Sequence, residues 1–94
     1  MAAEYVVSMF MEHAGTPRDQ EALRQLAEAL PDATVGPADD VGIFDVTLSA
    51  DDFEHALTRV WDGVAASGTD DHIVFLEHPD IPEHWKSRTR SAPR

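Results

Sequence analysis

Residues 42–68 constrain the fold most, because they join the most regular strand pattern of the chain to its most regular helix pattern. Large apolar residues of the strand alternate with smaller or polar ones, which is typical of a strand with one covered face. Phe44, Val46 and Leu48 form the predicted covered face, and Ile43, Asp45 and Thr47 lie on the opposite face. This stretch predicts a strand and a helix that share one core.

The helix that follows is predicted to begin after Ser49, because the run Ser-Ala-Asp-Asp resembles a capping box. Gly68 is predicted to end it, since glycine readily adopts the left-handed conformation that often terminates helices. Residues at helical spacing form its predicted buried face, namely Phe53, Leu57, Val60, Trp61 and Val64.

Four further elements are expected outside this stretch. Residues 5–11 and 72–77 are apolar runs of strand length, and residues 33–36 form a weaker strand. A helix is predicted from Pro17 to about Leu30, with Thr16 as N-cap and Asp19 completing a capping box. After the last strand, Ile81 and Trp85 are expected to anchor a segment that wraps the body.

The resulting order is strand, helix, strand, strand, helix, strand. It predicts an α+β domain of ferredoxin-like βαββαβ topology, with a four-stranded antiparallel sheet of order 4-1-3-2 and two helices on one face. Residues 1–85 are predicted to form this single domain, and residues 86–94 a basic, flexible C-terminal tail.

The charge is unevenly distributed. The formal net charge is -11, and all 18 acidic residues occur up to Glu83, where the strong bases are only Arg18, Arg24 and Arg59. A folded body of this kind repels phosphate backbones, so we expect no nucleic acid to bind it. No apolar run reaches the roughly 18 residues that a membrane-spanning helix needs, and no membrane partner is expected.

The chain contains no cysteine. Disulfides, thiolate ligands and thiol nucleophiles are therefore excluded, and a cytoplasmic location is the expectation.

The sheet face turned away from the helices is the predicted ligand or interface site. It should combine apolar and polar side chains from two central strands, namely Val6, Ser8, Phe10, Ile43, Asp45 and Thr47. An exposed patch of this kind needs a cover. Three covers are considered: a second copy in a homodimer, a ligand, or the C-terminal segment of the same chain.

Histidines and carboxylates near the strand ends suggest a weaker metal hypothesis. The candidate ligands are Glu12, His13, Asp71 and His72, a set with the nitrogen and oxygen donors that zinc accepts. Their spacing matches no established metal motif, so no metal and no cofactor is predicted.

No motif identifies a reaction. The chain has neither a Ser-His-Asp signature nor a glycine-rich phosphate loop, and no catalytic residue is assigned. The predicted function is a homodimeric protein-interaction or regulatory ligand-binding module without catalysis. The alternative is a cofactor-independent enzyme of oxygenase or isomerase type with a pocket on the open sheet face, and a divalent-metal binder is a weaker alternative.

Overall fold

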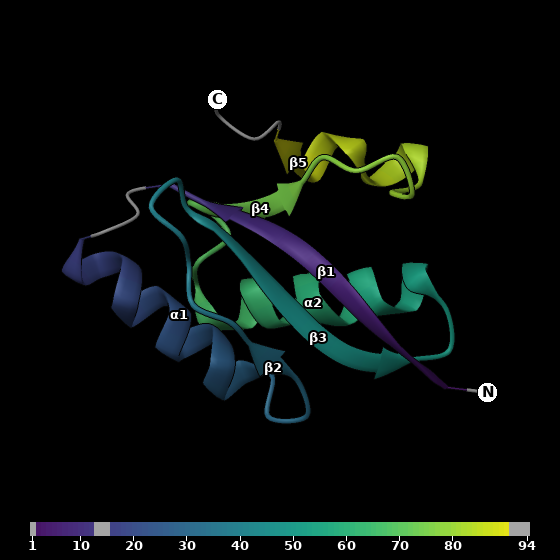
Figure 1. Cartoon of the computed structure of the whole chain (residues 1–94), viewed down its shortest axis with the longest axis horizontal. Helices are drawn as coiled ribbons and strands as arrows, with labels where there is room; N and C mark the ends of the chain where they lie inside the picture. The colour runs from purple at the N-terminus through teal and green to yellow at the C-terminus, as the bar shows by residue number, and fades with distance from the viewer. Residues whose placement is uncertain (1, 13–15, 91–94) are drawn as a thin grey trace.

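A single sheet and two long helices make up the molecule (Figure 1), and the computed structural model describes residues 2–12 and 16–90. The elements in chain order are β1 (Ala3–Met11), α1 (Pro17–Ala29), β2 (Thr34–Val35), β3 (Ile43–Ala50), α2 (Phe53–Ser67), β4 (Ile73–Leu76), the 3-10 helix η1 (Glu83–Arg88) and β5 (Thr89–Arg90). The two helices and the first four strands were all expected from the sequence.

The sheet has the order β2-β3-β1-β4-β5. The pairs β1–β3, β1–β4 and β2–β3 are antiparallel, whereas β4 and β5 are parallel. The expectation of a four-stranded, wholly antiparallel sheet is therefore wrong, because β5 extends the order beyond β4 and makes the sheet mixed. This extra strand has only two residues, so it carries no alternation that a sequence pattern would reveal.

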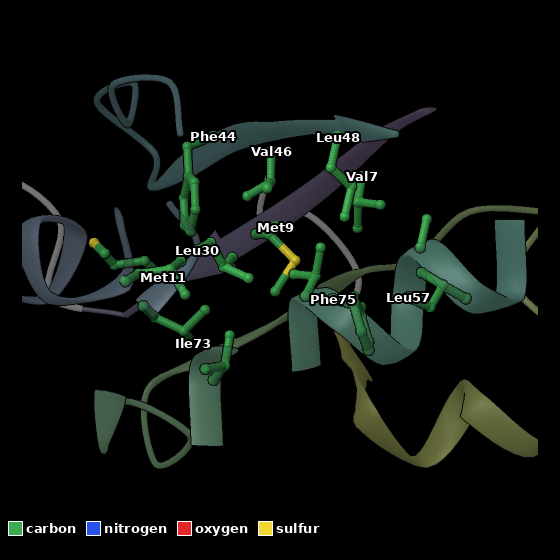
Figure 2. Close-up of a cluster of buried hydrophobic side chains, with 14 of the residues drawn as sticks. Val7, Met9, Met11, Leu30, Phe44, Val46, Leu48, Leu57, Ile73 and Phe75 are labelled. Carbon is green, nitrogen blue, oxygen red and sulfur yellow. The ribbon is translucent and has the colours of Figure 1, made fainter. Parts of the chain in front are cut away.

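The core lies between the sheet and the helices. Figure 2 shows Val7, Met9 and Met11 of β1 beside Phe44, Val46 and Leu48 of β3, and these residues are all at most 2% exposed. Burying a side chain of this size stabilises the fold by roughly 1.5–3 kcal/mol. The predicted core faces of both central strands are confirmed, and they leave the alternate residues on the opposite face of the sheet.

The start of α2 differs from the expectation. Ser49 lies in β3, where it pairs with Glu4, and Asp52 is the N-cap, its carboxylate accepting the backbone N–H of His55 at 2.7 Å. Ser49 as N-cap is wrong because pairing with β1 continues through Ala50 and delays the helix.

The end of α2 follows the expectation. Gly68 has a φ of 74°, and its N–H bonds to the carbonyl of Ala65 at 3.2 Å. Among the described residues, no helix has both the length and the apolar character needed to cross a membrane. The Asp19 side chain, which was expected to complete a capping box on α1, lies outside the described side chains.

The C-terminal segment packs against the body. Ile81 and Trp85 are buried as anchors, and the Trp85 ring meets Phe75 edge-on with centroids 5.5 Å apart. Arg88 lies 5.0 Å from the Trp85 ring and 5.6 Å from the Trp61 ring. Within the stretch predicted as a tail, residues 86–88 are the end of η1 and residues 89–90 form β5, while residues 91–94 lie outside the described part.

Candidate functional site

The six residues predicted for the open sheet face are brought together as cross-strand neighbours. The register places Val6 opposite Thr47, Ser8 opposite Asp45, and Phe10 opposite Ile43. The Ser8 hydroxyl donates to the Asp45 carboxylate at 2.9 Å. The face is therefore a mixed surface in which the two central polar groups already bond to each other.

One of these six residues is not available at the surface. Phe10 is 7% exposed, and the guanidinium of Arg90 lies 5.7 Å from its ring centroid. Arg90 also pairs with the Glu12 carboxylate. The last strand thus covers one end of the open face, and Val6, at 54% exposure, lies toward the other end.

The N-terminal half of β1 has an unpaired edge. β3 pairs with β1 along residues 3–10, whereas β4 pairs only with Met9, Phe10 and Met11. Figure 1 shows β1 continuing well past the end of β4. Although β1 lies between β3 and β4 in the sheet, its N-terminal half is paired only with β3 and so has one free edge.

The direction of the backbone groups follows from two hydrogen bonds. Met11 N–H donates to Gly42 on the β3 side, and Glu12 N–H donates to His72 on the β4 side. Because antiparallel pairing alternates along a strand, the even-numbered residues of β1 face the β4 side. Glu4 and Val6 therefore point their N–H and C=O groups to the free edge, where no other described residue bonds to them.

A cavity of about 360 Å³ adjoins this free edge. Residues from both faces of β1, from the start of α2 and from the segment after β4 line it, namely Tyr5, Val6, Val7, Ser8, Phe53, Leu57, Leu76, His78, Asp80 and Ile81. Most of these side chains are apolar, and the rings of Tyr5 and Phe53 pack with centroids 6.1 Å apart. The cavity fills the position that a longer β4 would occupy.

Apart from Tyr5, the titratable groups that line the cavity are two exposed side chains, His78 and Asp80. His78 Nδ1 accepts the backbone N–H of Asp80 at 3.1 Å, and it lies 3.6 Å from the Asp80 carboxylate. The two side chains are 55% and 77% exposed. Because water reaches both side chains, they can interact electrostatically with a charged ligand at the rim of the cavity. They are not shielded from solvent in the way that a group specialised for proton transfer is.

Sequence patterns missed this cavity, although one signal for it exists. The predicted first strand is longer than the last, and two prolines, Pro79 and Pro82, follow the last strand closely. Proline has no N–H to donate and is disfavoured inside a paired strand, so two prolines at this place favour an early end of the strand. A long central strand beside a short, proline-terminated neighbour indicates a gap in the sheet.

A second polar cluster surrounds His72. Its Nδ1 donates to the Asp71 carboxylate at 2.6 Å, and Arg18 lies 3.6 Å from the same carboxylate. The hydrogen bond from His72 is the main cause that lowers the pKa of the Asp71 carboxyl. The Nε2 atom of His72 is buried without a hydrogen-bond partner among the described residues.

The metal candidates do not assemble in the described part of the chain. Glu12 pairs with Arg90, and Asp71 is engaged by His72 and Arg18. His13 lies outside the described residues. Within residues 2–12 and 16–90, no group of three histidine, aspartate or glutamate side chains is placed to hold a metal ion.

Comparison of the chain with protein-family models, curated proteins and solved structures found no match.

Proposed function

We propose that this protein is an interaction module that binds an extended segment of another polypeptide by adding it as a strand to the free edge of β1. The observation that carries the proposal is the pair of unpartnered backbone positions at Glu4 and Val6. Each position has one donor and one acceptor, so an antiparallel partner strand forms up to four hydrogen bonds there. Strand addition of this kind is a recurrent mode of peptide recognition.

The cavity supports the proposal because it provides room for side chains beside the new backbone bonds. Its volume of about 360 Å³ falls at the lower end of the roughly 300–1,000 Å³ typical of ligand sites. Side chains of an added strand alternate between the two sheet faces. Those on the helix side meet Tyr5, Phe53 and Leu57, where they exchange water for apolar contact.

Catalysis has less support than binding. An enzyme that uses no cofactor needs an acid or base held within reach of a bound substrate. The titratable groups that line the cavity besides Tyr5 are His78 and Asp80, and both are more than half exposed. We therefore assign no catalytic residue.

Nuclear magnetic resonance titration with a neutral, strand-prone peptide, acetyl-Thr-Val-Thr-Val-Thr-amide, tests the proposal. We expect the amide signals of Glu4 and Val6 to shift most. Val6→Pro should weaken binding about three- to tenfold, because it removes one donor that faces the free edge while the β3 ladder stays intact. Val6→Thr is the matched control, since it keeps both the N–H and the β-branched shape.

A second measurement leaves the protein unchanged. N-methylation of the central threonine of the peptide removes a donor that faces β1, because the partner residues that bond to Glu4 and Val6 carry their side chains on the open face of the sheet, and it should also weaken binding. Equal affinity of the methylated and unmethylated peptides, or shifts that avoid β1, would show that strand addition does not occur.

The open sheet face supports a second proposal, a homodimer that packs sheet on sheet. Val6 at 54% exposure and the partly exposed Ile43 are the apolar groups that favour it. In this proposal β1, α1, β2, β3, α2 and β4 form a ferredoxin-like unit, and β5 is an addition to it. The same proposal places the protein in the cytoplasm. Light scattering distinguishes the two proposals, because Ile43→Glu should convert a dimer to a monomer and should leave peptide binding at the β1 edge unchanged.

A further inference from the structure

We infer that the partner strand carries lysine or arginine in alternation with apolar residues, so that the free edge of β1 selects cationic extended segments. This inference rests on the proposed function and names the chemistry of its ligand. It is carried by the charges around the cavity, together with the direction of the free backbone groups.

Among the described residues, no lysine or arginine lines the cavity, and the one strongly charged residue that lines it is the acid Asp80. Every charged residue other than histidine that lines the cavity, or directly adjoins a lining residue in the chain, is acidic, namely Glu4, Asp52, Glu54, Glu77 and Asp80. The nearby bases of the C-terminal segment are engaged elsewhere: Arg88 stacks on two tryptophans, and Arg90 pairs with Glu12. Of these acids, Asp52 is the N-cap of α2 and Glu54 pairs with His84 at 2.9 Å, so a cationic partner chiefly meets the carboxylates of Glu4 and Asp80.

Alternation of the partner follows from the geometry of the edge. Glu4 and Val6 are separated by one residue, so their side chains share the open face of the sheet. Partner side chains on that face lie beside the Glu4 carboxylate, whereas those on the other face meet Tyr5, Phe53 and Leu57. Cationic residues suit the first set of positions, and apolar residues suit the second.

A second copy of this chain is a poorer occupant of the same edge. Two chains with a formal charge of -11 each repel one another, and pairing across the β1 edge would bring two acidic rims together. A cationic segment is attracted by the same field, and this attraction weakens as salt shortens the screening length.

Three peptides of the same length and pattern test the inference: acetyl-Lys-Val-Lys-Val-Lys-amide and its counterparts with threonine or glutamate in place of lysine. At low salt we expect the lysine peptide to bind about tenfold more tightly than the threonine peptide, and the glutamate peptide more weakly than both. The preference for lysine should shrink as salt is raised.

Asp80→Asn and Asp62→Asn form a matched pair of variants. Both remove one negative charge, but Asp80 lines the cavity, whereas Asp62 lies on α2 beside a different hollow formed with the end of α1. Asp80→Asn should reduce the lysine preference about two- to fivefold, as expected for loss of one exposed ion pair, and Asp62→Asn should change it little.

The outcomes separate this inference from the proposed function. Equal binding of the lysine and threonine peptides, or equal effects of the two variants, would overturn the cationic preference and leave strand addition standing. Failure of all three peptides to bind would remove the proposed function and this inference with it. A concentration-dependent dimer that the lysine peptide fails to dissociate would make a second copy the occupant of the edge.

Discussion

At the scale of single residues, Asp39 has the clearest structural role. Its Oδ1 atom accepts the backbone N–H groups of Val41, Gly42 and Ile43 at 3.0, 2.9 and 2.9 Å, and so holds the turn that leads into β3. The hydrogen bond from Ile43 is the main cause that lowers the pKa of the Asp39 carboxyl. Asp39→Ala should lower the melting temperature by a few degrees, measured by circular dichroism.

The dependence on pH separates the charge of Asp39 from its shape. A carboxyl whose pKa is lowered by folding stabilises the folded state above its unfolded pKa, and this contribution is lost as the pH falls through the folded pKa. Asp39→Asn keeps an acceptor oxygen without the charge. It should therefore be less stable than wild type at neutral pH and equal to it at strongly acidic pH. A difference that persists in acid would contradict the assignment to charge.

At the scale of elements, the packing of α2 against the end of α1 depends on Gly63. A Cβ atom at this position would lie 2.6 Å from Cγ and 2.7 Å from Cδ2 of Leu30. Gly63→Ala should gain up to about 1 kcal/mol of helix propensity but lose roughly 1–3 kcal/mol to overpacking. We expect a net loss of about 1 kcal/mol in the free energy of unfolding, measured by urea denaturation.

The Leu30→Ala background provides the control for this prediction. Once the leucine side chain is removed, the alanine at position 63 has no steric conflict and only the propensity gain remains. The same substitution should therefore stabilise the Leu30→Ala protein. Destabilisation in both backgrounds would place the cost elsewhere than in the contact with Leu30.

Local sequence patterns predict the central strands and helices, but they fail where pairing between residues far apart in the sequence determines the structure. The alternation of Phe44, Val46 and Leu48 predicts the core face of β3, because its period of two is a local property. The N-cap was misplaced to Ser49 because the partner that extends β3, Glu4, is far away in sequence. The cavity depends on the relative lengths of β1 and β4, which a single strand pattern does not contain.

At the scale of the whole molecule, the charge imbalance predicts how stability depends on salt. A formal charge of -11 on 94 residues repels itself more strongly in the compact state than in the expanded one. Opposing contributions come from exposed ion pairs, such as Arg24 with Glu28 at 2.7 Å, but such pairs contribute only about 0–1 kcal/mol each. We therefore expect self-repulsion to be the larger effect.

Calorimetry in sodium chloride measures this balance. Raising the salt from about 10 mM to about 0.1 M shortens the screening length from about 30 Å to about 10 Å. The melting temperature should rise by several degrees over this range, because screening relieves the repulsion among the acids. Potassium chloride should act equally if screening alone is responsible. A melting temperature that falls with salt would mean that the ion pairs stabilise the folded state by more than the self-repulsion destabilises it. It would also weaken the case that acidic residues near the β1 edge attract a cationic partner strand.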